Sequence, residues 1–198
     1  AQKIIGIFAA MRDFARELQR AGHRMHYLAI DDPANHQSLP ANLDWLIAEY
    51  SADVFEYQAP DEWRLDQQLA DYVRQLAIPG QMVDSEHFYT QRDEAALLFS
   101  TRKQWLMEYF YRQMRLRHGI LMAGPGKPLG GQWNFDHDNR KPWPGLPHAP
   151  ADWRNRHDHS MLWQSIRQAG VISFGEPSAH DFLWPLNRAE ALQQLDDF

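Results

Sequence analysis

The sequence predicts an α/β fold, a parallel sheet with helices packed on its faces, over residues 1 to about 90. Apolar residues recur at helical spacing in several segments, and short aliphatic runs alternate with those segments. Helices and strands that alternate at this interval are typical of β-α-β units, whose strands pair in parallel. With 198 residues of which 44% are hydrophobic, the chain is long enough to bury a core.

The first element is a helix over residues 2–21, because its apolar side chains fall on one face and Gly22 is well placed to end it. The later elements are assigned in the same way: a strand at 24–30, a helix at 38–50, a strand at 52–57, a helix at 61–77 and a strand at 80–83. An α/β domain normally begins with a strand that helps to form the ligand crevice. We therefore expect a first strand to precede Ala1 in the natural protein.

The second half of the chain has a different character. Residues 101–118 predict an amphipathic helix whose polar side carries five basic residues against Glu108 alone, a local net charge of +4; the five are Arg102, Lys103, Arg112, Arg115 and Arg117. Residues 120–155 are rich in Gly, Pro and Trp and show no periodicity. A helix returns at 159–169, and Asn187 with Glu190 predicts a capping box that opens a last helix.

Composition and motifs exclude several classes of function. The net charge of −6 argues against nucleic-acid binding by bulk electrostatics, so a surface for nucleic acid must be local. The absence of cysteine excludes disulfides, thiolate catalysis and cysteine-held metal clusters in this chain. The sequence has no GxSxG, GxGxxG or Walker motif, and no apolar run typical of a membrane span or signal peptide. We expect a cytoplasmic monomer.

Histidine and aspartate groups offer weaker candidates. His137 between two aspartates and the HDH triplet at 157–159 lack the spacing of a metal site, so we interpret them as turn and cap residues and expect no metal. The Asp31-Asp32 pair follows the strand predicted at 24–30. It is either a turn or a ligand contact at the strand end, and the sequence leaves both open.

The stretch GGQWNFDHDNRKPWPG, residues 130–145, is unusually dense in turn-forming and aromatic residues. We interpret it as scaffold: its Asp and Asn side chains bind backbone amides, its glycines permit tight bends, and Trp133 and Phe135 anchor it. Basic residues interleaved with tryptophans suit phosphate contact combined with base stacking. The candidate DNA contacts are therefore Arg140, Lys141, Arg154 and Arg156.

Several stretches resemble the photolyase-related proteins, the bacterial lineage that includes the iron–sulfur (6-4) photolyases and related cryptochromes. They are STRKQWLMEYFYRQMRLRHGILM, KPLGGQWNFDHDNRKPWPG, KIIGIFAAMRDFARELQRAGHRMHYLAIDDPAN and EPSAHDFLWPLNRAEALQQLDDF. The resemblance implies a Rossmann-like α/β antenna domain at 1–118, with the basic helix at its end. It also implies that 119–198 is a loop-rich and helical linker toward a flavin-binding domain absent from this chain.

The resemblance further implies light-driven repair of (6-4) photoproducts in UV-damaged DNA, or blue-light sensing. The full-length protein would carry FAD and a 4Fe-4S cluster in its C-terminal flavin domain, and a ribityl-lumazine antenna in the α/β domain. Because this chain has no cysteine, we expect antenna and scaffold roles here and no electron-transfer chemistry. Lys3 and Ile7, one helical turn apart, are the candidate antenna contacts; the alternative places Ile7 in the core and Lys3 in solvent.

Two other functions stay open at this point. The chain could be a stand-alone, non-catalytic nucleic-acid-binding module that uses the basic helix and the Trp-rich loop. It could also have a structural role only, bracing the flavin domain after losing its chromophore. The lesion that the full-length protein repairs cannot be read from these residues, because lesion recognition would lie in the flavin domain.

Overall fold

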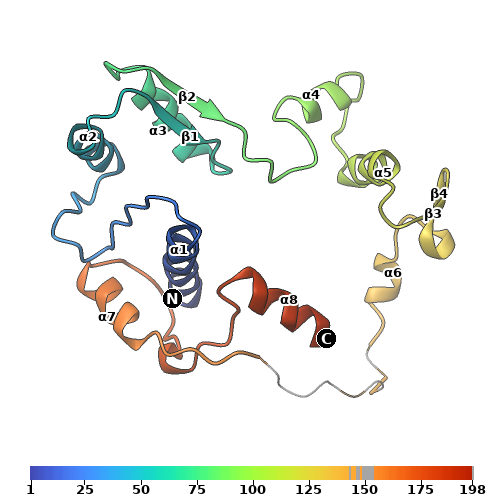
Figure 1. The fold of residues 1–198 in the computed structure, drawn as a ribbon. Helices are drawn as coiled ribbons and strands as arrows, with labels where there is room; N and C mark the ends of the chain where they lie inside the picture. Colours follow the sequence, from blue (N-terminus) through green and yellow to red (C-terminus); the bar gives the residue numbers. More distant parts are fainter. Residues whose placement is uncertain (143, 146–147, 149–153, 198) are drawn as a thin grey trace. The chain divides into compact units, whose positions relative to one another are not determined.

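The computed structural model describes residues 1–142, 144–145, 148 and 154–197. They form two compact units, one from Ala1–Ala52 with the described residues of Pro147–Phe198, the other from the described residues of Asp53–Leu146 (Figure 1). These units group residues by contact, and their bounds differ from the expected domains 1–118 and 119–198. That domain division stays a prediction, and each unit is described by itself.

The first unit is helical in its described part. Its elements are α1 (Gln2–Arg20), α2 (Leu39–Glu49), α7 (Ser160–Gln168), the 3-10 turn η2 (Ala179–Asp181) and α8 (Arg188–Asp197). The helices predicted at 2–21, 38–50 and 159–169 are therefore confirmed to within one or two residues. Gly22 ends α1 as expected: its φ is +92°, and its N–H donates to the carbonyl of Gln19 at 3.0 Å.

The core of this unit forms where α1 meets α7 and the chain around η2. Its buried members are Ile5, Ala9, Leu162, Ile166, Ala179 and Phe182. Ile5 and Ile166 are fully buried, and each has a buried neighbour four residues away on its own helix, which is the spacing of one helix face. The helical periodicity in the sequence predicted these helices, but it did not predict which of them pack together.

The capping box predicted at the start of α8 is present. The N–H of Glu190 donates to the side-chain oxygen of Asn187 at 2.9 Å. The carboxylate of Glu190 accepts in return from the N–H of Leu186 at 2.8 Å, one residue earlier than in the standard capping box. Two backbone donors at the start of the helix are thereby satisfied.

The second unit contains a β-α-β arrangement, as predicted. Strand β1 (Phe55–Gln58) pairs in parallel with β2 (Gly80–Val83), with Phe55 opposite Gly80 and Gln58 opposite Val83. Helix α3 (Trp63–Val73) connects the two strands (Figure 1). Tyr72 of α3 packs edge-on against the ring of Phe55 at 5.8 Å. The protein is thus of the mixed α/β class, with a small parallel sheet.

The remaining elements of this unit follow β2. They are α4 (Glu94–Leu98), α5 (Met107–His118), the hairpin strands β3 (Met122–Gly124) and β4 (Lys127–Pro128), the 3-10 turn η1 (Leu129–Gly131) and α6 (Asp136–Asn139). The stretch at 120–155, which shows no periodicity in the sequence, therefore contains short regular elements. Gly119 ends α5 in the left-handed region, at φ +65°.

Two sequence predictions were wrong in detail. Residues 24–30 form no strand and pair with no strand among the described residues, although their composition is aliphatic; a strand needs a hydrogen-bonded neighbour that local sequence does not supply. The basic helix begins at Met107, six residues later than predicted. Trp105 instead stacks on Phe99, with ring centroids 5.3 Å apart, so the chain before α5 packs as a turn.

Candidate functional site

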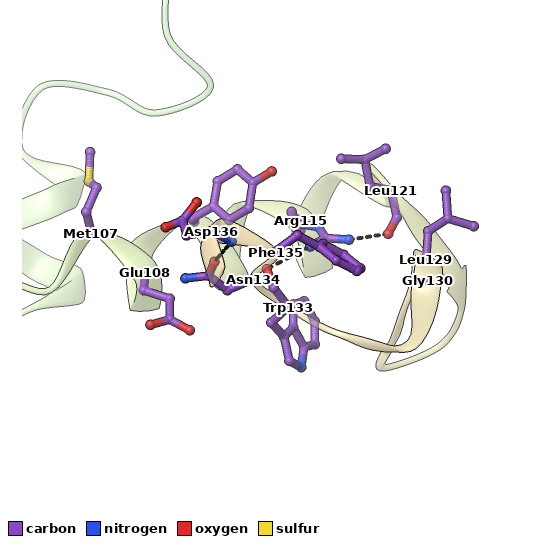
Figure 2. Close-up of a pocket in the computed structure, with 11 residues that line it drawn as sticks. Met107, Glu108, Arg115, Leu121, Leu129, Gly130, Trp133, Asn134, Phe135 and Asp136 are labelled. Atoms are coloured by element: carbon purple, nitrogen blue, oxygen red, sulfur yellow. Dashed lines mark hydrogen bonds between the residues drawn. The ribbon is translucent and has the colours of Figure 1, made fainter. Parts of the chain in front are cut away.

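The second unit holds a pocket of about 660 Å³ between α5 and the segment 129–136, which belongs to the stretch singled out in the sequence. Figure 2 shows its lining, which combines aromatic and aliphatic walls with two carboxylates at the rim. The lining residues are Met107, Glu108, Tyr111, Arg115, Leu121, Leu129, Gly130, Trp133, Asn134, Phe135 and Asp136. Only some of these residues belong to the stretch 130–145 or to the predicted basic face, and the others carry no motif in the sequence.

Arg115 lies in the wall of the pocket with only 5% of its surface exposed. Its guanidinium donates to the carbonyls of Trp133 at 3.4 Å and Leu121 (Figure 2). It also donates to the carbonyl of Ile120 at 3.3 Å. It also lies 5.1 Å from the ring of Trp133. Arg115, predicted to lie on the polar side of the helix, is therefore buried instead: this cation ties the loop after α5 to the helix and is not free for a ligand.

Three other cations of the basic segment also have partners. Arg112 pairs with Glu108 at 2.6 Å, and Arg117 pairs with Glu94 of α4. The guanidinium of Arg102 lies 3.4 Å from the centre of the Tyr109 ring. The local charge of +4 is therefore largely engaged within the unit, which leaves little of it for a phosphate backbone.

Gly130 shapes the other wall of the pocket. Its φ is +75°, a conformation that favours glycine, and a Cβ at this position would lie 2.8 Å from the Phe135 ring carbon Cζ. The glycine thus lets the ring of Phe135 lie against the backbone. Trp133 is half-buried, whereas Phe135 is exposed at the pocket. Of the two aromatic residues predicted to anchor the segment, Trp133 is therefore the more buried one.

Turn chemistry explains Asn134, as predicted, whereas Asp138 forms an ion pair instead of binding a backbone amide. The side-chain oxygen of Asn134 accepts from the N–H of Asp136 at 2.7 Å. Asp138 accepts from the ammonium of Lys141 at 2.7 Å. The pocket thus contains no nucleophile hydrogen-bonded to a general base; its walls are suited to holding an apolar or aromatic group.

The four candidate DNA contacts are divided between the two units. Arg140 and Lys141 follow α6 in the second unit, and both are exposed. Arg154 and Arg156 are exposed in the first unit, where Arg156 pairs with Asp181 at 2.8 Å. The structure does not bring the four into one unit, and their role in DNA binding stays a prediction.

The two candidate antenna contacts are both exposed on α1. Ile7 is 50% exposed, and Ile5 rather than Ile7 fills the core. The alternative that placed Ile7 in the core is therefore not what the structure shows. Lys3 is in solvent, one turn before Ile7 along the same helix. Their role as chromophore contacts stays a prediction.

Asp31 has a partner that the sequence did not reveal. The hydroxyl of Ser165, 134 residues away, donates to its carboxylate at 2.6 Å. This hydrogen bond is the main cause that lowers the pKa of Asp31 below its ordinary value, with Arg12 adding a smaller electrostatic effect. Asp32 forms a turn, since its carboxylate accepts from the N–H of Ala34 at 2.9 Å. Both aspartates thus have a structural explanation.

The histidines at 157 and 159 are likewise explained by their neighbours. His157 lies 3.2 Å from the carboxylate of Glu190. His159 packs edge-on against Phe182 at 5.4 Å, and burial, followed by the nearby His157, lowers its pKa. Within the described residues, no group of three or more His, Cys, Asp or Glu could hold a metal ion.

The fold and the pocket define an α/β protein with an aromatic-walled binding pocket, and comparison with known proteins gives its family. Residues 1–182 match the family described as deoxyribodipyrimidine photo-lyase-related protein, and the chain belongs to this family. A "(6-4) photolyase" of Agrobacterium fabrum (strain C58 / ATCC 33970) is 36% identical over 141 residues. That alignment covers 71% of this chain but only 28% of the relative. Among the helices described, none is long and apolar enough to cross a membrane.

Proposed function

We propose that this chain is one segment of a photolyase-related flavoprotein that repairs (6-4) photoproducts in DNA or senses blue light. The observation that carries the proposal is the family match over residues 1–182, together with 36% identity to a (6-4) photolyase. Within the full-length protein, residues 1–118 would form a Rossmann-like antenna domain and residues 119–198 a linker to the flavin domain. The parallel β1-α3-β2 unit supports the first assignment.

In this proposal the chain positions other groups and does not itself transfer electrons. It contains no cysteine, so its residues do not fit a 4Fe-4S cluster. FAD, held in the flavin domain, would supply the light-driven electron transfer when bound. The scaffold role is supported by Arg115, which ties the loop before the family-like 130–145 stretch to α5.

The antenna role is supported by the two apolar faces of α1. One face, with Ile5 and Ala9, is buried against α7 and η2, and the other exposes Ile7 and Phe14. An exposed apolar face that begins beside Lys3 offers contact to a planar ribityl-lumazine ring and a cation for its polar groups. No other residue of the chain is assigned to the antenna.

Spectroscopy and repair of the full-length protein test the main proposal. We expect flavin absorbance bands in the purified protein and, if it is a repair enzyme, light-dependent restoration of a duplex that contains one (6-4) photoproduct. The same duplex in the dark is the control. A purified protein without flavin bands would overturn the proposal, whereas bands without repair would favour the photoreceptor.

The antenna contacts are tested by the full-length variants Lys3→Ala and Ile7→Ala. We expect both to reduce the amount of lumazine that co-purifies with the protein while flavin content stays unchanged. Leu192→Ala, which truncates an exposed apolar side chain of α8, away from the exposed face of α1, is the matched control. Equal lumazine content in all three variants would remove Lys3 and Ile7 from the proposed site.

The DNA contacts are tested by titrating full-length variants against undamaged and UV-irradiated duplexes at two salt concentrations. Replacing Arg140 or Lys141 by alanine should weaken DNA binding. Each replacement should also reduce the slope of the logarithm of the binding constant against the logarithm of the salt concentration by about one. The same result is expected for Arg154→Ala and Arg156→Ala. Arg64→Ala, an exposed arginine of α3, is the control. Because the cations of α5 are largely engaged, we expect the 198-residue chain alone not to bind DNA, which separates this proposal from a stand-alone binding module.

A further inference from the structure

A small hollow of about 250 Å³ lies in the first unit, between the second half of α1 and the segment 24–30, and has no part in the function proposed above. The residues that line it are Arg12, Ala15, Arg16, Gln19, Tyr27 and Ala29. Those of α1 follow the i, i+3, i+4, i+7 spacing of one helix face. Both strands of the parallel sheet belong to the second unit, so this hollow is not a part of the sheet.

Every polar side chain in the lining can donate a hydrogen bond. Arg12 and Arg16 are cations that carry donors only, and Tyr27 adds a hydroxyl. Gln19 adds an amide, which also donates to the carbonyl of Met25 at 3.4 Å. Among the described residues that line the hollow, none is acidic. In a chain with a net charge of −6, such a lining is unusual and favours an anion.

The two arginines of the hollow have no counter-charge of their own. Many arginines of the chain form ion pairs with carboxylates, namely Arg64, Arg74, Arg92, Arg112, Arg117 and Arg156. Within the part of the chain that the structure describes, neither Arg12 nor Arg16 does so. Because like charges four residues apart on a helix repel each other, an anion bound between them would relieve an unfavourable interaction.

Asp31 is an acidic group near Arg12, but it does not neutralise the hollow. Its carboxylate is bound by the hydroxyl of Ser165 at 2.6 Å. This hydrogen bond lowers the pKa of Asp31 more than the charge of Arg12 does, so the arginine interacts with it only weakly. The guanidinium groups therefore keep N–H donors for a ligand.

A phosphate monoester matches the hollow in charge and in hydrogen-bonding atoms. Its charge at pH 7 is about −1.5 to −2, which balances two guanidinium groups. Its three terminal oxygens can accept from the arginines of α1 on one side and from the hydroxyl of Tyr27 on the other. A phosphodiester within a nucleic acid carries a single charge and two free oxygens, and its chain must leave the hollow in two directions. The hollow therefore suits a monoester better.

We propose that Arg12, Arg16 and Tyr27 bind the phosphate group of a small phosphate monoester. The site is separate from the proposed antenna contacts, because Arg16 comes about two and a half turns after Ile7 and leaves α1 on the opposite side. The proposal goes beyond the function argued above and does not depend on it. It involves binding only, with no chemical step.

Calorimetric titration of the full-length protein tests the proposal with glycerol 3-phosphate and with a single-stranded oligonucleotide that has no terminal phosphate. Glycerol 3-phosphate should bind saturably, with a Kd below about 1 mM. Arg12→Gln and Arg16→Gln should each weaken this binding about tenfold, because each removes a charged donor. Tyr27→Phe, which removes only the hydroxyl, should weaken it about threefold. Any binding of the oligonucleotide should be unchanged in these variants.

A matched variant distinguishes a built site from the general positive charge of α1. Arg20→Gln removes the next arginine of the same helix, which is exposed and lies outside the hollow. It should bind glycerol 3-phosphate within about twofold of the parent. Far-UV circular dichroism checks that all variants are folded.

Three results would overturn the proposal. The first is that glycerol 3-phosphate shows no saturable binding by about 10 mM. The second is that Arg20→Gln weakens its binding as much as Arg16→Gln, since the charge of the helix would then act without a defined site. The third is that Arg12→Gln and Arg16→Gln weaken oligonucleotide binding but leave glycerol 3-phosphate binding unchanged, which would make this surface a nucleic-acid contact.

Discussion

Replacing Arg115 by methionine tests whether this buried cation holds the loop after α5. The substitution keeps an unbranched apolar stem and removes the guanidinium with its three hydrogen bonds, to Ile120, Leu121 and Trp133. A hydrogen bond from a charged donor contributes about 1.5–3 kcal/mol, but these carbonyls lie near the surface, where water can replace part of the loss. At about 1 kcal/mol each, the variant should lose about 3 kcal/mol of unfolding free energy.

Urea denaturation of the chain, followed by far-UV circular dichroism, measures this loss. With a denaturant slope of about 2 kcal/mol per molar urea, a loss of about 3 kcal/mol moves the midpoint down by about 1.5 M. Arg117→Met is the matched control, because Arg117 lies on the same helix, is exposed and makes a surface ion pair with Glu94. Its midpoint should move far less than that of Arg115→Met.

Equal urea midpoints for the two variants would show that Arg115 contributes no more to stability than a surface cation does, and would refute its assigned role. Hydrogen exchange adds a local measurement. In Arg115→Met, amides of residues 129–136 should exchange faster, because the loop loses its attachment to α5. Unchanged exchange in that segment would contradict the assigned role even if the midpoint moved.

Three further predictions follow from single contacts. Gly130→Ala should lower the free energy of unfolding by about 1–3 kcal/mol more than Gly131→Ala, because both glycines have a positive φ but only Gly130 lies against the Phe135 ring. Thermal unfolding compares the two variants, and equal losses would contradict the role of this contact. Ser165→Ala should raise the pKa of Asp31 toward 3.8, which NMR titration measures. In the parent protein, folding lowers this pKa. The contribution of Asp31 to stability is therefore present above pH 3.8 and is lost as the pH falls through the folded pKa. His159 has a folded pKa below its ordinary 6.5, so folding favours the neutral imidazole and the stability of the parent should fall as the pH drops below 6.5. The variant His159→Leu should lose less stability between about pH 7 and 5 than the parent. A pH dependence of stability unchanged from the parent would contradict this prediction.

Local patterns determined much of the secondary structure. Helix α1 and its end at Gly22 follow from side-chain spacing and from the conformational freedom of glycine. The capping box of Asn187 and Glu190 is a pattern of four adjacent positions, and it formed nearly as predicted. The β-α-β unit could be predicted because two apolar strands flank one amphipathic helix. In the first two cases the interacting groups are close along the chain. In the third, the order of strand, helix and strand is itself a pattern along the sequence.

Long-range contacts could not be predicted in this way. The bond from Ser165 to Asp31 joins residues 134 positions apart, and neither residue carries a signal of it. The aliphatic composition of 24–30 predicted a strand, but pairing needs a neighbour supplied by the rest of the fold.

The stretch GGQWNFDHDNRKPWPG shows most clearly which features the sequence determined and which the tertiary structure decided. The sequence by itself determined its turns, because glycine and asparagine act on their own backbone, and it supplied the resemblance by which the family was first inferred. Only the tertiary structure decided that its first half forms a pocket wall and that Arg115, predicted to face solvent, is buried behind it. Burial depends on which carbonyls and rings the fold brings around a side chain, and helical spacing alone gives the face of a residue but not its neighbours.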